Sequence, residues 1–117
     1  MPPEFQPSDV MKSAFDEIGA TLTAIRAQAT SGTNDERDSL KELYKQIMQK
    51  YQVLIFRDLK TMDDDPEILA NLAKLTAISH NLAKIKREMV NAREAVDRAI
   101  KVLGYTDELL GFLAKFA

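Results

Sequence analysis

The stretch that decides the fold is residues 66–103, PEILANLAKLTAISHNLAKIKREMVNAREAVDRAIKVL. Apolar residues recur in it at every seventh position, at Ile68, Leu75, Leu82, Met89, Val96 and Leu103. Four of these are followed three positions later by a second apolar residue, at Ile78, Ile85, Ala92 and Ala99. Sustained spacing of this kind is typical of a helix that packs against other helices as coiled coils do. The pattern therefore predicts one long helix over about residues 65–103.

Three consecutive aspartates, Asp63 to Asp65, stand immediately before this helix. A residue that precedes proline favours extended backbone, which is the conformation of a helix N-cap, and Pro66 suits the first helical position. A calcium loop instead spreads its oxygen ligands over about a dozen residues around a glycine turn. No such loop follows here. We therefore interpret the run as a helix boundary capped by Asp65, with no metal site.

Two more helices are expected before the aspartates, over about residues 8–30 and 34–62. Each has an apolar stripe with steps of three and four residues, as an amphipathic helix requires. Gly32 is available for a left-handed turn between them, and Thr33 with Glu36 matches a capping box. The members of the two stripes are Met11, Phe15, Ile18, Leu22, Ile25 and Ala29, and then Leu40, Tyr44, Ile47, Tyr51 and Leu54.

The remaining segments complete the expected architecture. Gly104 is predicted to cap the long helix at its C-terminus, so that a short last helix covers about residues 106–116. Residues 1–7 are expected to form a flexible N-terminal segment. The chain is thus predicted to be a single all-α domain over residues 1–117. Its fold class would be an antiparallel bundle of three long helices and one short C-terminal helix, with coiled-coil-like packing.

Composition excludes several classes of protein. The 117 residues are 45% hydrophobic and 29% charged, with a net charge of −2 and no cysteine. Thiol catalysis, cysteine-bound zinc and disulfides are therefore excluded. No apolar run approaches the length of a membrane span, and the start of the chain does not resemble a secretory signal. We expect a cytoplasmic protein without a membrane span.

The sequence shows no pattern of catalytic or cofactor-binding residues. His80, the only histidine, falls on the predicted solvent face, and its neighbour Ser79 points about 100° away around the helix. The four glycines are scattered and form no phosphate-binding loop. We therefore expect no enzymatic activity, no cofactor and no bound metal.

Apolar surface at the ends of the predicted helices suggests protein binding instead. The second helix and the start of the third would form a two-helix tip without a third wall, and the last helix has little polar face. Such surface is typical of association with a protein partner or a second copy, and a dimer is expected. The alternatives are that the N-terminal segment and Met62 close the tip, and that the last helix folds back on the bundle. The candidate interface residues are Val53, Phe56, Leu59, Leu69 and Leu72 in the tip, and Leu109, Phe112, Leu113 and Phe116 in the last helix.

A second candidate surface is a basic ridge on the third predicted helix, formed by Lys84, Arg87, Arg98 and Lys101. Such a ridge can follow a phosphate backbone or an acidic protein, and a solvated helix face is its simplest interpretation. The leading hypothesis is a non-enzymatic interaction module such as an adaptor, chaperone, inhibitor or assembly subunit. The alternative is a small helical subunit of a nucleic-acid-bound assembly. The identity of the partner is left open by the sequence.

Overall fold

The computed structural model describes residues 7–56 and 65–114, and within these residues the chain forms five helices and no strand. The all-α prediction is therefore confirmed. Residues 1–6 of the expected flexible segment, and residues 57–62 of the predicted second helix, lie outside the described residues. The helices are α1 (Pro7–Gln28), α2 (Asn34–Ile55), α3 (Pro66–Ala70), α4 (Leu72–Arg87) and α5 (Ala92–Ala114).

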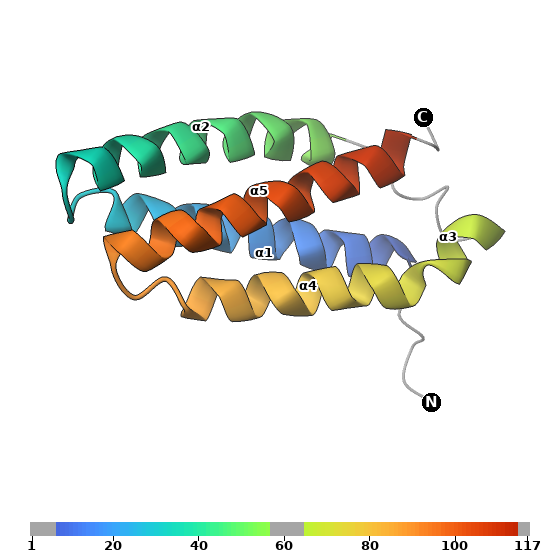
Figure 1. The fold of residues 1–117 in the computed structure, drawn as a ribbon. Helices are drawn as coiled ribbons and strands as arrows, with labels where there is room; N and C mark the ends of the chain where they lie inside the picture. The colour runs from blue at the N-terminus through green and yellow to red at the C-terminus, as the bar shows by residue number, and fades with distance from the viewer. Residues whose placement is uncertain (1–6, 57–64, 115–117) are drawn as a thin grey trace.

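Four long helices lie side by side, and the short α3 lies at one end of them (Figure 1). The most extensive packing joins α1 to α4 and α2 to α5. The chain runs in the same direction within each of these two pairs, and consecutive long helices run in opposite directions (Figure 1). The expected bundle of three long helices is therefore replaced by one with four, in which helices distant in the sequence make the main contacts.

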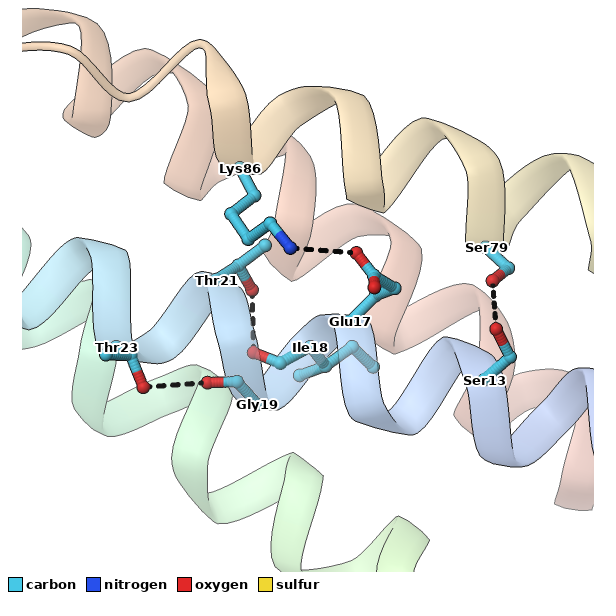
Figure 2. Close-up of polar contacts among 8 residues, drawn as sticks. All are labelled: Ser13, Glu17, Ile18, Gly19, Thr21, Thr23, Ser79 and Lys86. Carbon is cyan, nitrogen blue, oxygen red and sulfur yellow. Dashed lines mark hydrogen bonds and ion pairs between the residues drawn. The ribbon is translucent and has the colours of Figure 1, made fainter.

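Polar contacts between α1 and α4 confirm their common direction (Figure 2). Ser13 Oγ of α1 lies 2.9 Å from Ser79 Oγ of α4. One to two turns further along both helices, Lys86 Nζ lies 3.6 Å from Glu17 Oε2. Since the residue numbers increase together on both helices, α1 and α4 are parallel neighbours.

The two helices of the first hairpin differ in depth. α1 packs against α2, α4 and α5, and its residues Met11, Ile18 and Ile25 are fully buried. The fully buried residues of α2 are Leu40, Ile47 and Leu54, spaced by seven. Leu43, Tyr44, Met48 and Tyr51, beside this line, are partly buried against the same core. The polar side of α2 faces away from the bundle.

The prediction of one helix over residues 65–103 is wrong, because the chain bends twice. The first bend is at Asn71, between α3 and α4. Its side-chain Nδ2 donates a hydrogen bond to the carbonyl oxygen of Glu67 at 2.7 Å, and its backbone leaves helical geometry with φ −103° and ψ 9°. Asparagine favours such local side-chain bonds over the regular helical ladder.

The second bend reverses the chain between Arg87 and Ala92. Asn91 Oδ1 accepts a hydrogen bond from the backbone N–H of Glu94 at 2.8 Å, which satisfies one of the free donors at the start of α5. An asparagine followed three residues later by a glutamate is a recognisable start signal for a helix. The uninterrupted heptad spacing concealed this signal in the sequence.

The predicted helix end at Gly104, and with it the separate helix over residues 106–116, is also wrong. Among the described residues only Gly32 has a positive φ, so Gly104 does not adopt the left-handed conformation of a C-cap. A buried stripe with steps of three and four passes through this point and keeps α5 in one piece. Its members are Ala92, Ala95, Ala99, Val102, Thr106, Leu109 and Leu113.

Replacing Gly104 by alanine is expected to stabilise the protein by about 0.5–1 kcal/mol, because glycine in a helix interior is less favourable than alanine. A methyl group at this position meets no atom within 4 Å. Chemical denaturation of Gly104→Ala and wild type measures the difference. A destabilised variant would mean that Gly104 ends a helix as the sequence first suggests.

Two helix starts read from the sequence, at Asp65 and at Thr33, are confirmed. Asp65 Oδ1 accepts a hydrogen bond from the N–H of Glu67 at 2.9 Å, as the interpretation of a capping aspartate requires. Asp63 and Asp64 lie outside the described residues. At the start of α2, Thr33 Oγ1 accepts from the N–H of Glu36 at 3.1 Å, and Glu36 Oε1 accepts from the N–H of Thr33 at 2.9 Å. This reciprocal pair closes the turn between α1 and α2.

Candidate interaction surfaces

The predicted apolar interface divides between the surface and the core. Leu109 is fully buried and Leu113 is 4% exposed, so these two residues belong to the core and are not a free surface. This is a correction, and its reason is that they continue the buried stripe of α5. Leu72 and Phe112 are half-buried and pack against the same core. Leu59 and Phe116 lie outside the described residues.

Val53, Phe56 and Leu69 are exposed, as the sequence predicts. Phe56, directly after α2, is 85% exposed, which is the largest exposed fraction of any large apolar side chain in the described part of the chain. Ile55 is exposed as well, although it lies in an apolar run of the sequence that is typical of a core segment. We call the four residues Val53, Ile55, Phe56 and Leu69 the distal apolar patch.

The position of the patch follows from the elements that carry it. Val53, Ile55 and Phe56 lie at the C-terminal end of α2, and Leu69 lies on α3, at the same end of the molecule (Figure 1). Leu54 takes the buried position at this end of α2 and points inward. Since successive helical residues point about 100° apart, Val53 and Ile55 lie on opposite flanks of α2, one on each side of Leu54.

A second apolar opening runs between α2 and α5. Its floor is Leu43, Val96 and Ile100, and the side chain of Ile100 is 55% exposed. Asp38 and Glu42 line the rim on the α2 side. The volume is about 450 Å³. The sequence did not indicate this opening, because Val96 was placed on the predicted core seam.

The four residues of the basic ridge are distributed over two helices. Lys84 and Arg87 lie on α4 and Lys101 on α5, and all three are exposed. Arg98 is half-buried, with its Nε 3.1 Å from Glu88 Oε1 and its Nη2 3.8 Å from Glu94 Oε2. Two carboxylates thus hold Arg98 in place. The ridge presents three free basic side chains where four were expected.

His80 lines a small groove between α1 and α4, together with Asp9, Ser13 and Ser79. The two serine hydroxyls are hydrogen bonded to each other at 2.9 Å. A serine nucleophile instead needs a hydrogen bond to its general base. The arrangement is that of a polar helix contact rather than of an activated nucleophile.

The described residues contain neither a cluster of metal ligands nor a helix that could span a membrane. Across residues 7–56 and 65–114, no three histidine, aspartate or glutamate side chains gather closely enough to hold a metal ion. None of the helices described here has both the length and the apolar character that are needed to cross a bilayer.

Comparisons of the chain with protein-family models, with curated proteins and with solved structures find no match.

Proposed function

We propose that this chain is a non-enzymatic protein-binding module, that the distal apolar patch is its binding surface, and that its first partner is a second copy of itself. The observation that supports this most is the exposure of Phe56, at 85%. Removing one such side chain from water contributes about 1.5–3 kcal/mol, and several exposed together mark an interaction site. The cytoplasmic location and the dimer expected from the sequence are part of the proposal.

The bundle suits such a role because its long helices brace one another while one end presents the apolar side chains. Coiled-coil-like packing of the long helices, as the heptad spacing suggests, would keep this end rigid. A rigid patch loses little conformational freedom on binding, so more of the burial free energy appears as affinity. An adaptor, chaperone, inhibitor or assembly subunit could use the same surface for another protein.

The double substitution Val53→Ser and Phe56→Ser is expected to weaken self-association at least about tenfold, because it removes two large apolar contacts. Light scattering during size-exclusion chromatography over a range of concentrations measures the change. Ile100→Ser is the matched control, since Ile100 is also exposed but lies far from the patch on α5. Circular dichroism should show unchanged helicity in both variants.

Two results would contradict the proposal. A dimer that survives the double substitution with every helix packed in its own chain would show that the patch is not the contact, and a loss of helicity would show that these residues are core. The alternative of a nucleic-acid-bound subunit has the support of exposed Lys84, Arg87 and Lys101. It requires oligonucleotide binding that weakens steeply with salt, and less steeply when Lys84 and Lys101 are neutralised.

A further inference from the structure

The turn between α4 and α5, residues 88–91, contains no residue that stops a helix. Its sequence is Glu88, Met89, Val90 and Asn91, with neither glycine nor proline. None of the four has a positive φ, and Glu88 has the nearly helical values φ −88° and ψ −5°. A single helix can therefore pass through these residues without a steric penalty.

The apolar pattern of the sequence passes through the same turn. Leu82, Met89 and Val96 keep the spacing of seven from α4 into α5. In the bent form, the first N–H groups of α5 have no acceptor within the helix, and Asn91 satisfies the N–H of Glu94. In a continuous helix, carbonyl groups of α4 and of the turn would accept from these donors. Both forms are thus compatible with the residues of the turn.

The turn between α1 and α2 is different. Gly32 has φ +92° in the bent form, and glycine is unfavourable in the interior of a continuous helix. Thr33 and Glu36 also hold the next residues in the bent form by their reciprocal hydrogen bonds. Of the two hairpins in the structure, the second is thus joined by the turn that straightens more easily. The contrast places the conformational freedom at residues 88–91.

α5 is held mainly by helices other than its hairpin partner. It packs most extensively against α2, then against α1, and least against α4. An ion pair between Lys50 and Asp107 adds to the contact with α2. An α5 supplied by a second copy would form the same contacts with α1 and α2. Exchange therefore preserves nearly all of the packing.

We propose that residues 88–91 are a hinge, and that two copies of the chain exchange α5 to form a domain-swapped dimer. In that dimer α4 and α5 join into one helix over residues 72–114, about 65 Å long. Each α5 packs on α1 and α2 of the other copy. The two chains cross at their hinges, where the 71% exposed side chain of Val90 is available for contact between the copies. Domain exchange is a low-cost route to a dimer because the contacts already exist within the monomer.

Three contacts favour the bent form and determine its equilibrium with the exchanged dimer. Gln28 Nε2 donates to the carbonyl oxygen of Met89 at 3.2 Å, and Arg98 Nε lies 3.1 Å from Glu88 Oε1. The cap by Asn91 is the third. All are polar contacts at or near the surface, where single contacts of this kind are weak. High protein concentration during refolding then shifts the population toward the exchanged dimer.

Cross-linking distinguishes the two forms. Lys74 Nζ of α4 lies 3.5 Å from Glu108 Oε1 of α5, and the chain has no cysteine of its own. In the variant Lys74→Cys, Glu108→Cys, a short bis-maleimide joins the two positions within one chain in the bent form. In a continuous helix the same two positions are about 50 Å apart, so the cross-link forms only between chains. The dimer is refolded at high concentration, isolated by gel filtration and cross-linked. Denaturing electrophoresis then shows whether the cross-link lies within one chain or between two chains.

The hinge variant is Asn91→Ala in this double-cysteine chain. Loss of one cap shifts each hinge about fivefold toward the continuous helix, so the dimerisation constant should rise about 25-fold for two hinges. Thr33→Ala is the matched control, because it removes a cap at the same end of the bundle but beside a turn in which glycine disfavours a continuous helix. Adding Val90→Gly to Asn91→Ala should reverse the rise, since glycine disfavours the continuous helix.

The expected result is a dimer with cross-links between chains, enriched by Asn91→Ala and not by Thr33→Ala. A dimer whose cross-links stay within each chain, or an Asn91→Ala variant that remains monomeric at every concentration, would overturn the proposal. Exchange uses no residue of the distal apolar patch. Val53→Ser with Phe56→Ser should therefore leave the exchanged dimer unchanged, and the two modes of association can fail independently.

Discussion

Truncation of Leu109 to alanine is expected to lower the free energy of unfolding by about 2–5 kcal/mol. Leu109 is fully buried near the C-terminal end of the stripe that α5 turns toward the core. The loss combines the transfer of the removed methyl groups and methine with the cavity that they leave. Urea denaturation followed by circular dichroism, repeated at several protein concentrations to separate folding from association, measures the change.

Phe56→Ala is the control for this measurement. Phe56 is also a large apolar residue, but its side chain is 85% exposed, so its truncation should change the free energy of unfolding by less than about 1 kcal/mol. If Leu109→Ala instead weakened association and left unfolding unchanged, the last part of α5 would be a surface element. In that case Leu109 would belong to the interface to which the sequence assigns it.

The features that the sequence predicted correctly depend on a few adjacent residues. The cap at Asp65 and the capping box of Thr33 and Glu36 involve only local geometry, and the structure confirms them. The all-helical fold follows from apolar spacing that each segment carries within itself. Local patterns of this kind survive in any tertiary arrangement.

The turn at residues 88–91 was missed for a physical reason. A heptad pattern is equally compatible with one long helix and with two helices of a hairpin, since both bury a seam with the same spacing. The two arrangements differ in the packing of α5 against α2 and α1. This packing joins residues distant in the sequence, so it cannot be predicted from a short stretch. The pair Asn91 and Glu94 is a local signal for the start of a new helix. The six apolar residues spaced by seven favour one continuous helix instead.

The error in the turn led to the errors in the interface. With one long helix assumed, Leu109 and Leu113 fell on a short separate helix and were assigned to a surface. In the structure the buried face of α5 contains Ala95 and Val102, and the bulkier Val96 and Leu103 are only partly buried. Alanine is apolar on either face of a helix, so hydrophobicity alone could not identify the buried side. The exposure of Val53 and Phe56 on α2 and of Leu69 on α3 is predicted correctly, and their role in binding stays a prediction.

Gly32→Ala is expected to destabilise the fold by about 2–4 kcal/mol, the opposite sign from the same substitution at Gly104. Gly32 has φ +92°, a conformation that costs an L residue about 1–2 kcal/mol. A methyl group there would lie 2.5 Å from Ala92 Cβ and 2.7 Å from Glu36 Oε1. The glutamate side chain can rotate only by giving up its hydrogen bond to Thr33, and Ala92 is buried at the start of α5. Overpacking of this kind costs about 1–3 kcal/mol.

A double-mutant cycle with Ala92→Gly separates the two causes. Removing the methyl group of Ala92 relieves the steric contact with a methyl group at position 32 but leaves the backbone conformation of that residue unchanged. We expect Gly32→Ala to cost about 1–2 kcal/mol less in the Ala92→Gly background than in wild type, which is the coupling between positions in direct contact. Equal costs in the two backgrounds would mean that the turn between α1 and α2 does not pack against α5. The two hairpins would then not pack at this end of the bundle as described. Only the positive φ of Gly32 would favour glycine at this position.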